Sequence, residues 1–244
     1  MKYLVHGAMG YMGREVLKLL GTQMPETEVI LADVNSDCET TLKNICDCTE
    51  TVDCIIDFSH HSATKTLTDF AVRTKTPLVI ATTGQTPEEL ALIDAAAGEI
   101  PVFLASNMSV GIAVLIRMAK EAAKAFPDAD IEIVEIHHNR KLDVPSGTAL
   151  SIGHALQSVR PDAVLNIGRH ENGRREKNQI DIHSLRMGNI AGIHEIHICT
   201  QTQTLTLRHE AHDRRLFAEG AIDAAKFLVG KPAGLYNIDH LLGA

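Results

Sequence analysis

The segment KYLVHGAMGYMG (residues 2–13) decides the fold. Its first five residues predict a buried strand, and Gly7, Gly10 and Gly13 follow at the start of a helix predicted over 11–21. Glycine lets a backbone approach a pyrophosphate closely, and a helix start offers unpaired N–H groups and the positive end of a dipole. The order of strand, glycine turn and helix predicts a dinucleotide-binding loop, although a tight turn without a ligand has the same spacing.

Asp33 supports this interpretation. It ends the next predicted strand (27–33), 20 residues after Gly13. A carboxylate at this place accepts hydrogen bonds from the hydroxyl groups of an adenosine ribose. The alternative is a solvated acid at the end of a strand.

Strands and helices continue to alternate through the first hundred residues. Strands are predicted at 53–58, 77–82 and 100–106, and helices at 62–75, with Ser62 as N-cap, and at 86–98. This alternation predicts a parallel sheet with helices on both faces, and such sheets bind ligands at the carboxyl ends of their strands. Cofactor contacts are therefore also expected from Ala81, Thr82, Thr83, Ala105, Ser106, Asn107 and Met108. For the two threonines, a simple approach to the next helix is the alternative.

The second half of the chain has a different pattern. A helix (109–126), a strand (130–138) and a helix (146–159) precede three strands without helices between them, at 179–186, 192–200 and 204–210. Strands in succession predict a mixed or antiparallel sheet. The class is therefore α/β, with a doubly wound, mostly parallel, Rossmann-like sheet and a smaller α+β domain. We assign residues 1–108 and 215–244 to a dinucleotide-binding domain, to which the last helix returns. Residues 109–214 form a second domain.

Composition excludes several classes of function. The net charge is −8 and no basic stripe is interleaved with aromatic residues, so nucleic-acid binding is not expected. The apolar runs are too short for a membrane span, and no signal peptide is evident, so we expect a cytoplasmic protein. Four of the five cysteines lie close together but lack paired C-x-x-C spacing, which favours reduced thiols over a metal site. They are Cys38, Cys46, Cys48 and Cys54.

The segment EIHHNRKLDVPSGTAL (residues 135–150) gathers polar and cationic groups between a strand and a helix. Ser146 is a good N-cap, and the N–H groups of Gly147 and Thr148 would point toward an anion. Lys141 carries a transferable proton, and His137 and the adjacent His138 titrate near neutrality. The segment predicts a pocket for a carboxylate-bearing substrate with an acid beside it. Structural histidines and a solvated lysine are the alternative.

The same segment resembles the pattern E-x-H-H-x-x-K-x-D-x-P-S-G-T-A of dihydrodipicolinate (4-hydroxy-tetrahydrodipicolinate) reductases. The resemblance covers nearly the whole chain, through GAMGYMG, IDFS, TTG, SNMSVG, HSLRMGNIAGIHE, RHEAHDRRLFAEGA and GLYNIDHLL. It implies an oxidoreductase of lysine (diaminopimelate) biosynthesis that uses NADH or NADPH. The implied reaction reduces 4-hydroxy-tetrahydrodipicolinate, or dihydrodipicolinate, to tetrahydrodipicolinate.

The resemblance implies that residues 109–214 form a substrate-binding and oligomerisation domain. It also implies that six residues of the glycine loop contact the cofactor: Gly7, Ala8, Met9, Gly10, Tyr11 and Met12. Roles for further residues follow from it as well. It implies that His137 donates or accepts a proton, that Lys141 donates one, and that His138 contacts the substrate. The helix start would hold one substrate carboxylate, through the N–H groups of Gly147 and Thr148 beside Ser146. The family fold implies a homotetramer built on the sheets of the substrate domain.

Three departures from the family leave the coenzyme preference open. The chain is short between Asp33 and Cys54, Ala81 stands where glycine is common, and His60 and His61 stand where an arginine often follows the D-F motif. Asp33 is followed by no cation within the next three residues, and a carboxylate repels a 2′-phosphate, so NADH is favoured.

Two rival functions are weaker. A two-domain reductase similar to homoserine dehydrogenase would not need H-H-x-x-K joined to P-S-G-T. A non-catalytic nucleotide sensor should have lost His137 or Lys141, and the chain has both.

Overall fold

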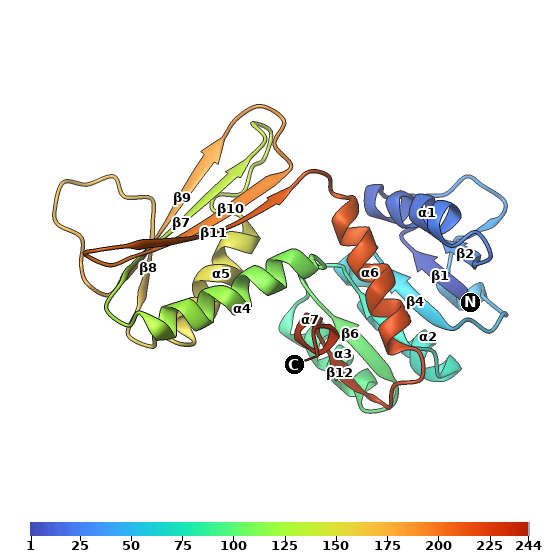
Figure 1. Cartoon of the computed structure of the whole chain (residues 1–244). Helices are drawn as coiled ribbons and strands as arrows, with labels where there is room; N and C mark the ends of the chain where they lie inside the picture. Colours follow the sequence, from blue (N-terminus) through green and yellow to red (C-terminus); the bar gives the residue numbers. More distant parts are fainter. Residues whose placement is uncertain (244) are drawn as a thin grey trace. The chain divides into compact units, whose positions relative to one another are not determined.

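The computed structural model describes residues 1–243. They divide into two compact units, one of Met1–Val110 together with the chain from Arg214 onward, and one of Gly111–Asp213. Figure 1 shows both units, and each is described by itself.

The first unit is built on a seven-stranded sheet in which every pairing is parallel. The alternating sequence predicted the parallel pairing, and the structure adds the order β12-β6-β5-β4-β1-β2-β3. Because β1 lies between β2 and β4, the carboxyl ends of β1 and β4 flank the topological switch point, where such sheets bind ligands. The strands are β1 (Lys2–His6), β2 (Glu28–Ala32), β3 (Thr41–Leu42), β4 (Cys54–Asp57), β5 (Leu78–Ile80), β6 (Pro101–Leu104) and β12 (Gly234–Tyr236).

Helices cover both faces of this sheet. Tyr3 and Ile56 belong to a core formed with α1 and α6, whereas the alternate residues Leu4 and Ile55 belong to a second core formed with α2 and α3. The strands are apolar on both sides because both sides are buried. The helices are α1 (Tyr11–Gln23), α2 (Thr64–Thr74), α3 (Pro87–Ala97), α6 (Arg215–Leu228) and α7 (Ile238–Leu241), with 3₁₀ turns η1 (Ile45–Asp47) and η2 (His61–Ala63).

Helix α6 reaches the first unit from the far end of the sequence and packs beside α1 (Figure 1). The same helix also lies close to the segment before α4 (Val110–Ala125), because a Cβ added at Gly220 would lie 1.8 Å from the carbonyl oxygen of Met108. Only a glycine fits at this position of the helix. In the structure α6 belongs to the first unit.

The second unit is a mixed five-stranded sheet in the order β11-β10-β7-β9-β8. β10 is antiparallel to β7 and β11, whereas β9 is parallel to β7 and β8. Helices α4 and α5 pack on one face against isoleucines such as Ile131 and Ile133. Polar pairs occupy the opposite face, among them Glu132 with His183 at 2.9 Å. The elements are α4 (Val110–Ala125), β7 (Asp130–His137), α5 (Gly147–Gln157), β8 (Val164–Ile167), β9 (Gln179–Arg186), β10 (Gly192–Cys199) and β11 (Thr204–Ala211).

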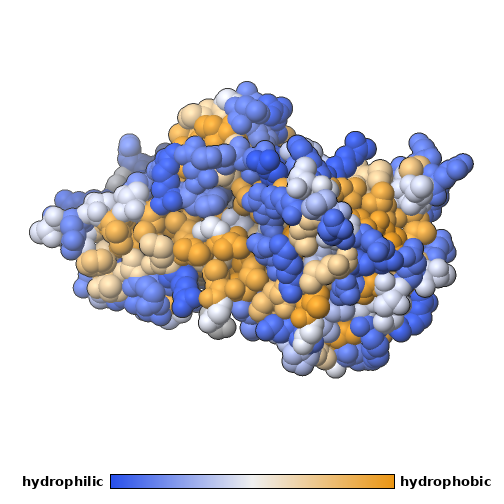
Figure 2. Space-filling view, turned by 45° about the vertical axis from the view of Figure 1, so that its right-hand side comes forward, coloured by the Kyte–Doolittle hydropathy of each residue, from blue (hydrophilic) through white to orange (hydrophobic). Residues whose placement is uncertain are grey.

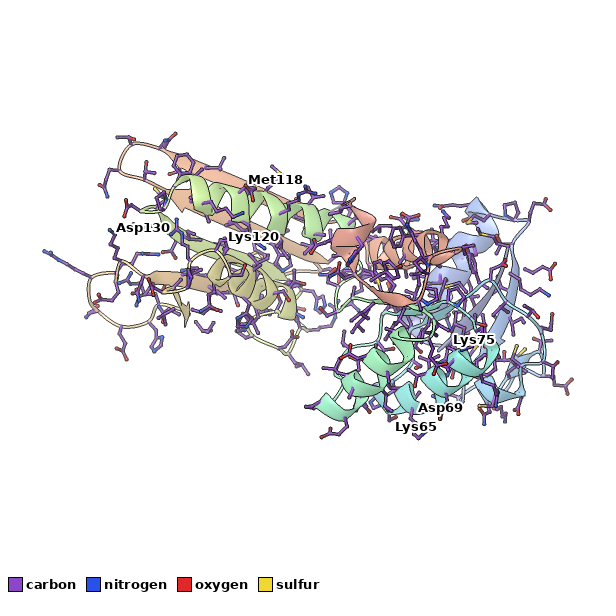
Figure 3. The ribbon with its side chains drawn as sticks, turned by 90° about the horizontal axis from the view of Figure 1, so that it is seen from below. Lys65, Asp69, Lys75, Met118, Lys120 and Asp130 are labelled. Atoms are coloured by element: carbon purple, nitrogen blue, oxygen red, sulfur yellow. The ribbon has the colours of Figure 1, made fainter. Side chains whose placement is uncertain are left out.

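The surface mixes polar and apolar areas (Figure 2). Charged side chains on the helices form local ion pairs, such as Lys65 and Asp69, whose N–O distance is 2.6 Å on α2 (Figure 3). Asp130, at the start of β7, receives a 2.8 Å hydrogen bond from Arg175. Within residues 1–243, no helix combines the length and apolar character needed to cross a membrane.

Five local features differ from the sequence prediction or escaped it. The short elements β3, β8, β12 and α7 were not predicted, because none of them is a continuous apolar run. Ser62 is not the N-cap of α2. That helix begins at Thr64 after the 3₁₀ turn η2, and the side chain of His60 accepts a hydrogen bond from the Ser62 N–H instead.

Candidate functional site

The glycine loop of the first unit depends on two of its glycines for its shape. Gly7 has a φ of +77°, and a Cβ there would lie 2.6 Å from the carbonyl oxygen of Phe58. At Gly13 a Cβ would lie 2.2 Å from the carbonyl oxygen of Gly7. The loop therefore folds tightly over the end of β4, and Gly10 becomes the N-cap of α1 without any side-chain hydrogen bond. The first N–H groups of α1 remain available to a ligand.

Asp33 anchors this loop to the end of β2. Its carboxylate accepts a 2.8 Å hydrogen bond from the Met9 N–H on one oxygen and another of 2.8 Å from the Asn35 N–H on the other. The side chain is buried, with 7% of the residue exposed. Each carboxylate oxygen has two lone pairs, so both can still accept from a ribose hydroxyl.

A cavity of about 490 Å³ lies at this edge of the sheet. Among the residues predicted to contact a cofactor, Gly7, Met9, Gly10 and Asp33 line it. Its wall also includes a cation that was not predicted, Arg14, whose Nε donates a 2.9 Å hydrogen bond to the Met9 carbonyl oxygen. The remaining lining residues are His6, Val34, Asn35, Phe58, Ser59, His60, Ser62 and Ala63.

Asp57, at the end of β4, joins three neighbouring strand ends below the cavity. One carboxylate oxygen lies 2.8 Å from His6 Nδ1 and accepts a 2.6 Å hydrogen bond from the Ser59 hydroxyl. The other oxygen accepts a 2.7 Å hydrogen bond from the Thr82 hydroxyl. The strand ends β1, β4 and β5 are thereby fixed to one another.

The other predicted cofactor residues lie around the same unit but do not line this cavity. Ala8 and Met108 are buried, and the Asn107 side chain accepts a hydrogen bond from the Ser109 N–H. Ala81 and Ala105 continue the sheet ladder, donating to the carbonyl oxygens of the strands beside them. Tyr11, Met12, Thr83 and Ser106 are at least partly exposed.

In the second unit, His137 ends β7 and is held by a buried acid. Its Nδ1 lies 2.5 Å from one carboxylate oxygen of Glu135, two residues earlier on the same face of the strand. Arg186, the partner of His137 on β9, donates two hydrogen bonds to the same carboxylate, at 2.8 and 2.7 Å. Such bidentate pairs fix geometry well.

The start of α5 belongs to the same network. The Ser146 N–H donates a 3.1 Å hydrogen bond to Glu135, and its hydroxyl accepts one of 3.2 Å from the Ala149 N–H, so the predicted N-cap is confirmed. The next residue, Gly147, is not required by packing, because an added Cβ would meet no atom within 4 Å. Gly147 and Thr148 form the first turn of the helix, with open space on the glycine side.

Lys141 lies on the loop between β7 and α5. Its Nζ is 2.8 Å from a carboxylate oxygen of Asp143, and the Asp143 carbonyl oxygen accepts a 2.7 Å hydrogen bond from Arg186. His138 directly follows β7, and its N–H donates to the Ile190 carbonyl oxygen. Because β7 ends at His137, the alternation that would turn His137 and His138 to opposite faces of the sheet does not extend to His138.

Electrostatics fixes the charge states of two buried groups near His137. Burial acts to raise the pKa of the Glu135 carboxyl, but the hydrogen bonds from His137 and Arg186 outweigh it, and the pKa falls well below its ordinary value. Burial, together with the neighbouring His137, lowers the pKa of His194 to about 3. Glu135 is therefore an anion and His194 a neutral ring at pH 7. The imidazole rings of His137 and His194 meet edge to face, with centroids 5.3 Å apart.

Sequence reasoning did not assign roles to Glu135, Arg186, His194 or Arg14. For Glu135 a signal was present, since residues two apart on a strand share a face. Arg186 and His194 are brought in by the strand register, in which they pair with His137 and Glu135. Register between distant strands cannot be read from this pattern.

The clustered cysteines lie on and around the segment after β2. Cys54 is fully buried in β4, and burial raises the pKa of its thiol. Cys38 and Cys46 are exposed, and Cys48 is partly exposed.

Comparison with known proteins matches both units. Residues 1–108 match the family model for the N-terminus of dihydrodipicolinate reductase, and residues 111–242 match that for its C-terminus. A solved structure, the dipicolinate-bound dihydrodipicolinate reductase from Paenisporosarcina sp. TG-14, has a TM-score of 0.75 and 24% identity over 97% of each chain, which shows the same fold.

Curated relatives match over the full length. The 4-hydroxy-tetrahydrodipicolinate reductase of Caldanaerobacter subterraneus subsp. tengcongensis is 42% identical over 249 residues, covering 99% of this chain and 98% of the relative. That of Alkaliphilus metalliredigens is 41% identical over 250 residues, covering 100% and 99%. With both halves matched by the family models and relatives aligned from end to end, this chain belongs to the dihydrodipicolinate reductase family.

Proposed function

We propose that the two units divide the work of an NAD(P)H-dependent reductase of lysine (diaminopimelate) biosynthesis, with the coenzyme on the first and the substrate on the second. The reaction is that of the family, reduction of 4-hydroxy-tetrahydrodipicolinate to tetrahydrodipicolinate. One observation carries the assignment of the second unit: the ionised Glu135 hydrogen-bonds both to His137 and to Ser146 at the start of α5. A proton-transfer group is thus fixed beside a helix start suited to a carboxylate.

The first unit has the features that a dinucleotide needs. The cavity is walled by the glycine loop, and bulk at Gly7 or Gly13 would collide with backbone atoms, so the backbone itself forms the surface. The bound nicotinamide would supply a hydride. The loop from Gly7 to Met12 would hold the pyrophosphate, Asp33 the adenosine ribose, and the strand ends at 81–83 and 105–108 the nicotinamide half.

The second unit would bind and protonate the substrate. The N–H groups of Gly147 and Thr148 would hold one carboxylate, His138 would contact the ring, and His137 with Lys141 would move the proton. Hydride addition builds negative charge on the substrate, and a positioned acid beside that charge lowers the barrier.

For the coenzyme we favour NADH, by a moderate margin. Asp33 accepts hydrogen bonds and would repel a 2′-phosphate, whereas Arg14 and His60 line the same cavity and would attract one. A difference of about tenfold in kcat/KM, about 1.4 kcal/mol, is consistent with these opposed effects. We also propose that the enzyme is cytoplasmic and works as a homotetramer assembled through the second unit.

The decisive experiment is a spectrophotometric assay. The product of the preceding synthase is supplied, and oxidation of NADH and NADPH is followed at the absorbance of the reduced nicotinamide. Pyridine-2,6-dicarboxylate, a flat dianion of similar shape, should inhibit competitively with the substrate. Absence of substrate-dependent oxidation with either coenzyme would refute the proposed function.

A further inference from the structure

Glu135 is the point at which three parts of the second unit meet. Its residue is fully buried, and its two oxygens accept four hydrogen bonds. One oxygen accepts from His137 Nδ1 and from Arg186, and the other accepts from Arg186 and from the Ser146 N–H.

We propose that Glu135 is a positioning residue, which fixes the tautomer of His137 and holds its ring in place relative to the start of α5. The inference rests on the proposed function, in which His137 transfers a proton to a substrate held at that helix start.

The tautomer follows from the charge of the acid. Glu135 is ionised, because the hydrogen bonds from His137 and Arg186 lower the pKa of its carboxyl despite burial. A carboxylate only accepts hydrogen bonds, so His137 must carry a proton on Nδ1. In the neutral ring, Nε2 is then the nitrogen that takes up or releases the transferred proton.

Space at Nε2 is provided by the neighbouring strand. A Cβ added at Gly192 on β10 would lie 3.0 Å from His137 Nε2, closer than almost any real side-chain contact. The glycine therefore leaves the reactive nitrogen uncovered on that side.

Arg186 extends the same control to the second proton donor. Besides holding Glu135, its Nη2 donates a 2.7 Å hydrogen bond to the Asp143 carbonyl oxygen. The Asp143 side chain in turn pairs with Lys141. One buried ion pair thus positions His137, Ser146 and the segment that carries Lys141.

The test replaces Glu135 by glutamine, which has nearly the same shape. Two N–H donors, from Arg186 and Ser146, converge on one oxygen position, so the amide oxygen should take that place. The amide NH₂ then faces His137 Nδ1, which must accept, so the ring proton moves to Nε2; the Arg186 Nη1–H directed at the same position loses its acceptor. The readout is the ¹⁵N NMR shift of the His137 ring nitrogens at a pH where the ring is neutral, with kcat and KM measured alongside. A wrong tautomer should lower kcat by roughly 10²–10⁴-fold while the KM for coenzyme stays constant.

Glu132→Gln is the matched control. Glu132 lies on the same strand with a histidine partner, His183, but on the opposite face of the sheet. This variant should keep the Nδ1–H tautomer of His137 and the wild-type kcat. A conservative pair tests the arginine: Arg186→Lys keeps a cation beside the carboxylate and should retain more kcat than Arg186→Met.

Two results would overturn the inference: a neutral His137 with its proton on Nε2 in the unaltered protein, or unchanged tautomer and kcat in Glu135→Gln. If Glu135→Gln does not fold, two measurements test the inference instead: the ¹⁵N spectrum of the His137 ring in the unaltered protein, and kcat of Arg186→Lys compared with that of Arg186→Met. An unaltered protein with the Nδ1–H tautomer but no reductase activity would refute the proposed function and leave the positioning of His137 supported.

Discussion

Acidification should destabilise this protein through His194, a ring with 4% of its residue exposed on β10. Burial and the neighbouring His137 lower its pKa from 6.5 to about 3. Between these values the unfolded chain binds a proton that the folded chain does not. The contribution of the neutral His194 to the free energy of unfolding is therefore fully present above the unfolded pKa of 6.5. It is lost as the pH falls toward the folded pKa of about 3. At about pH 5, which is about 1.5 pH units below the unfolded pKa, the free energy of unfolding is lower by about 2 kcal/mol.

The perturbation is His194→Gln, which keeps a polar group near the Ser146 hydroxyl and removes the titration. Urea unfolding at fixed protein concentration gives the free energy of unfolding at about pH 7.5 and about pH 5. The unaltered protein should lose about 2 kcal/mol more than the variant between these conditions. His154→Gln, at an exposed position on α5, is the control and should behave as the unaltered protein. Equal losses in the unaltered protein and His194→Gln would refute the reasoning.

Three further predictions concern catalysis, packing and the coenzyme. His137→Ala and Lys141→Ala should each lower kcat by roughly 10²–10⁴-fold with circular dichroism and coenzyme binding unchanged; wild-type kcat in both would contradict their assignment. Gly220→Ala places a methyl group against a backbone carbonyl and should lower the free energy of unfolding, measured by thermal unfolding, by about 3 kcal/mol or more. Gly21→Ala, in open space on α1, should raise the same free energy by about 0.5–1 kcal/mol. Val34→Arg, at a position 74% exposed beside the acid at the end of β2, should shift the ratio of kcat/KM values about tenfold toward NADPH. A preference of the unaltered protein for NADPH would contradict the argument from that acid.

The sequence predicted the elements with strong periodicity and missed those whose signal is short. Five parallel strands of the first unit, β1, β2, β4, β5 and β6, lie in continuous apolar runs bounded by glycine and polar residues, so their positions were readable. β3, β8, β12 and α7 are equally short or shorter but lack such a run, so no pattern marked them. The N-cap at Ser146 was readable because serine, glycine and an apolar run follow in the expected order. Ser62 had the same local appearance, but a 3₁₀ turn delays the start of α2.

The candidate site was predictable only in part, because its polar contacts depend on register. His137 and Lys141 were proposed as site residues from their residue types and spacing, and their roles stay a prediction. The ion pair between Glu135 and Arg186 joins residues 51 apart, and it forms because β7 and β9 pair in one particular register. Asp33 was predicted as an acceptor for a ligand, and the structure adds that it also accepts from the loop of its own chain.

The return of α6 to the first unit has a consequence for the order of synthesis. The core beside α1 includes Ala218, Ala221 and Leu228 of α6, so it is incomplete until the ribosome has made the end of the chain. The second unit is one continuous segment and needs nothing from outside residues 111–213 to close its own core. Domains usually fold in the order in which they emerge. In this protein the first unit emerges first but completes its core last, because α6, which covers one face of its sheet together with α1, follows the whole second unit in the sequence.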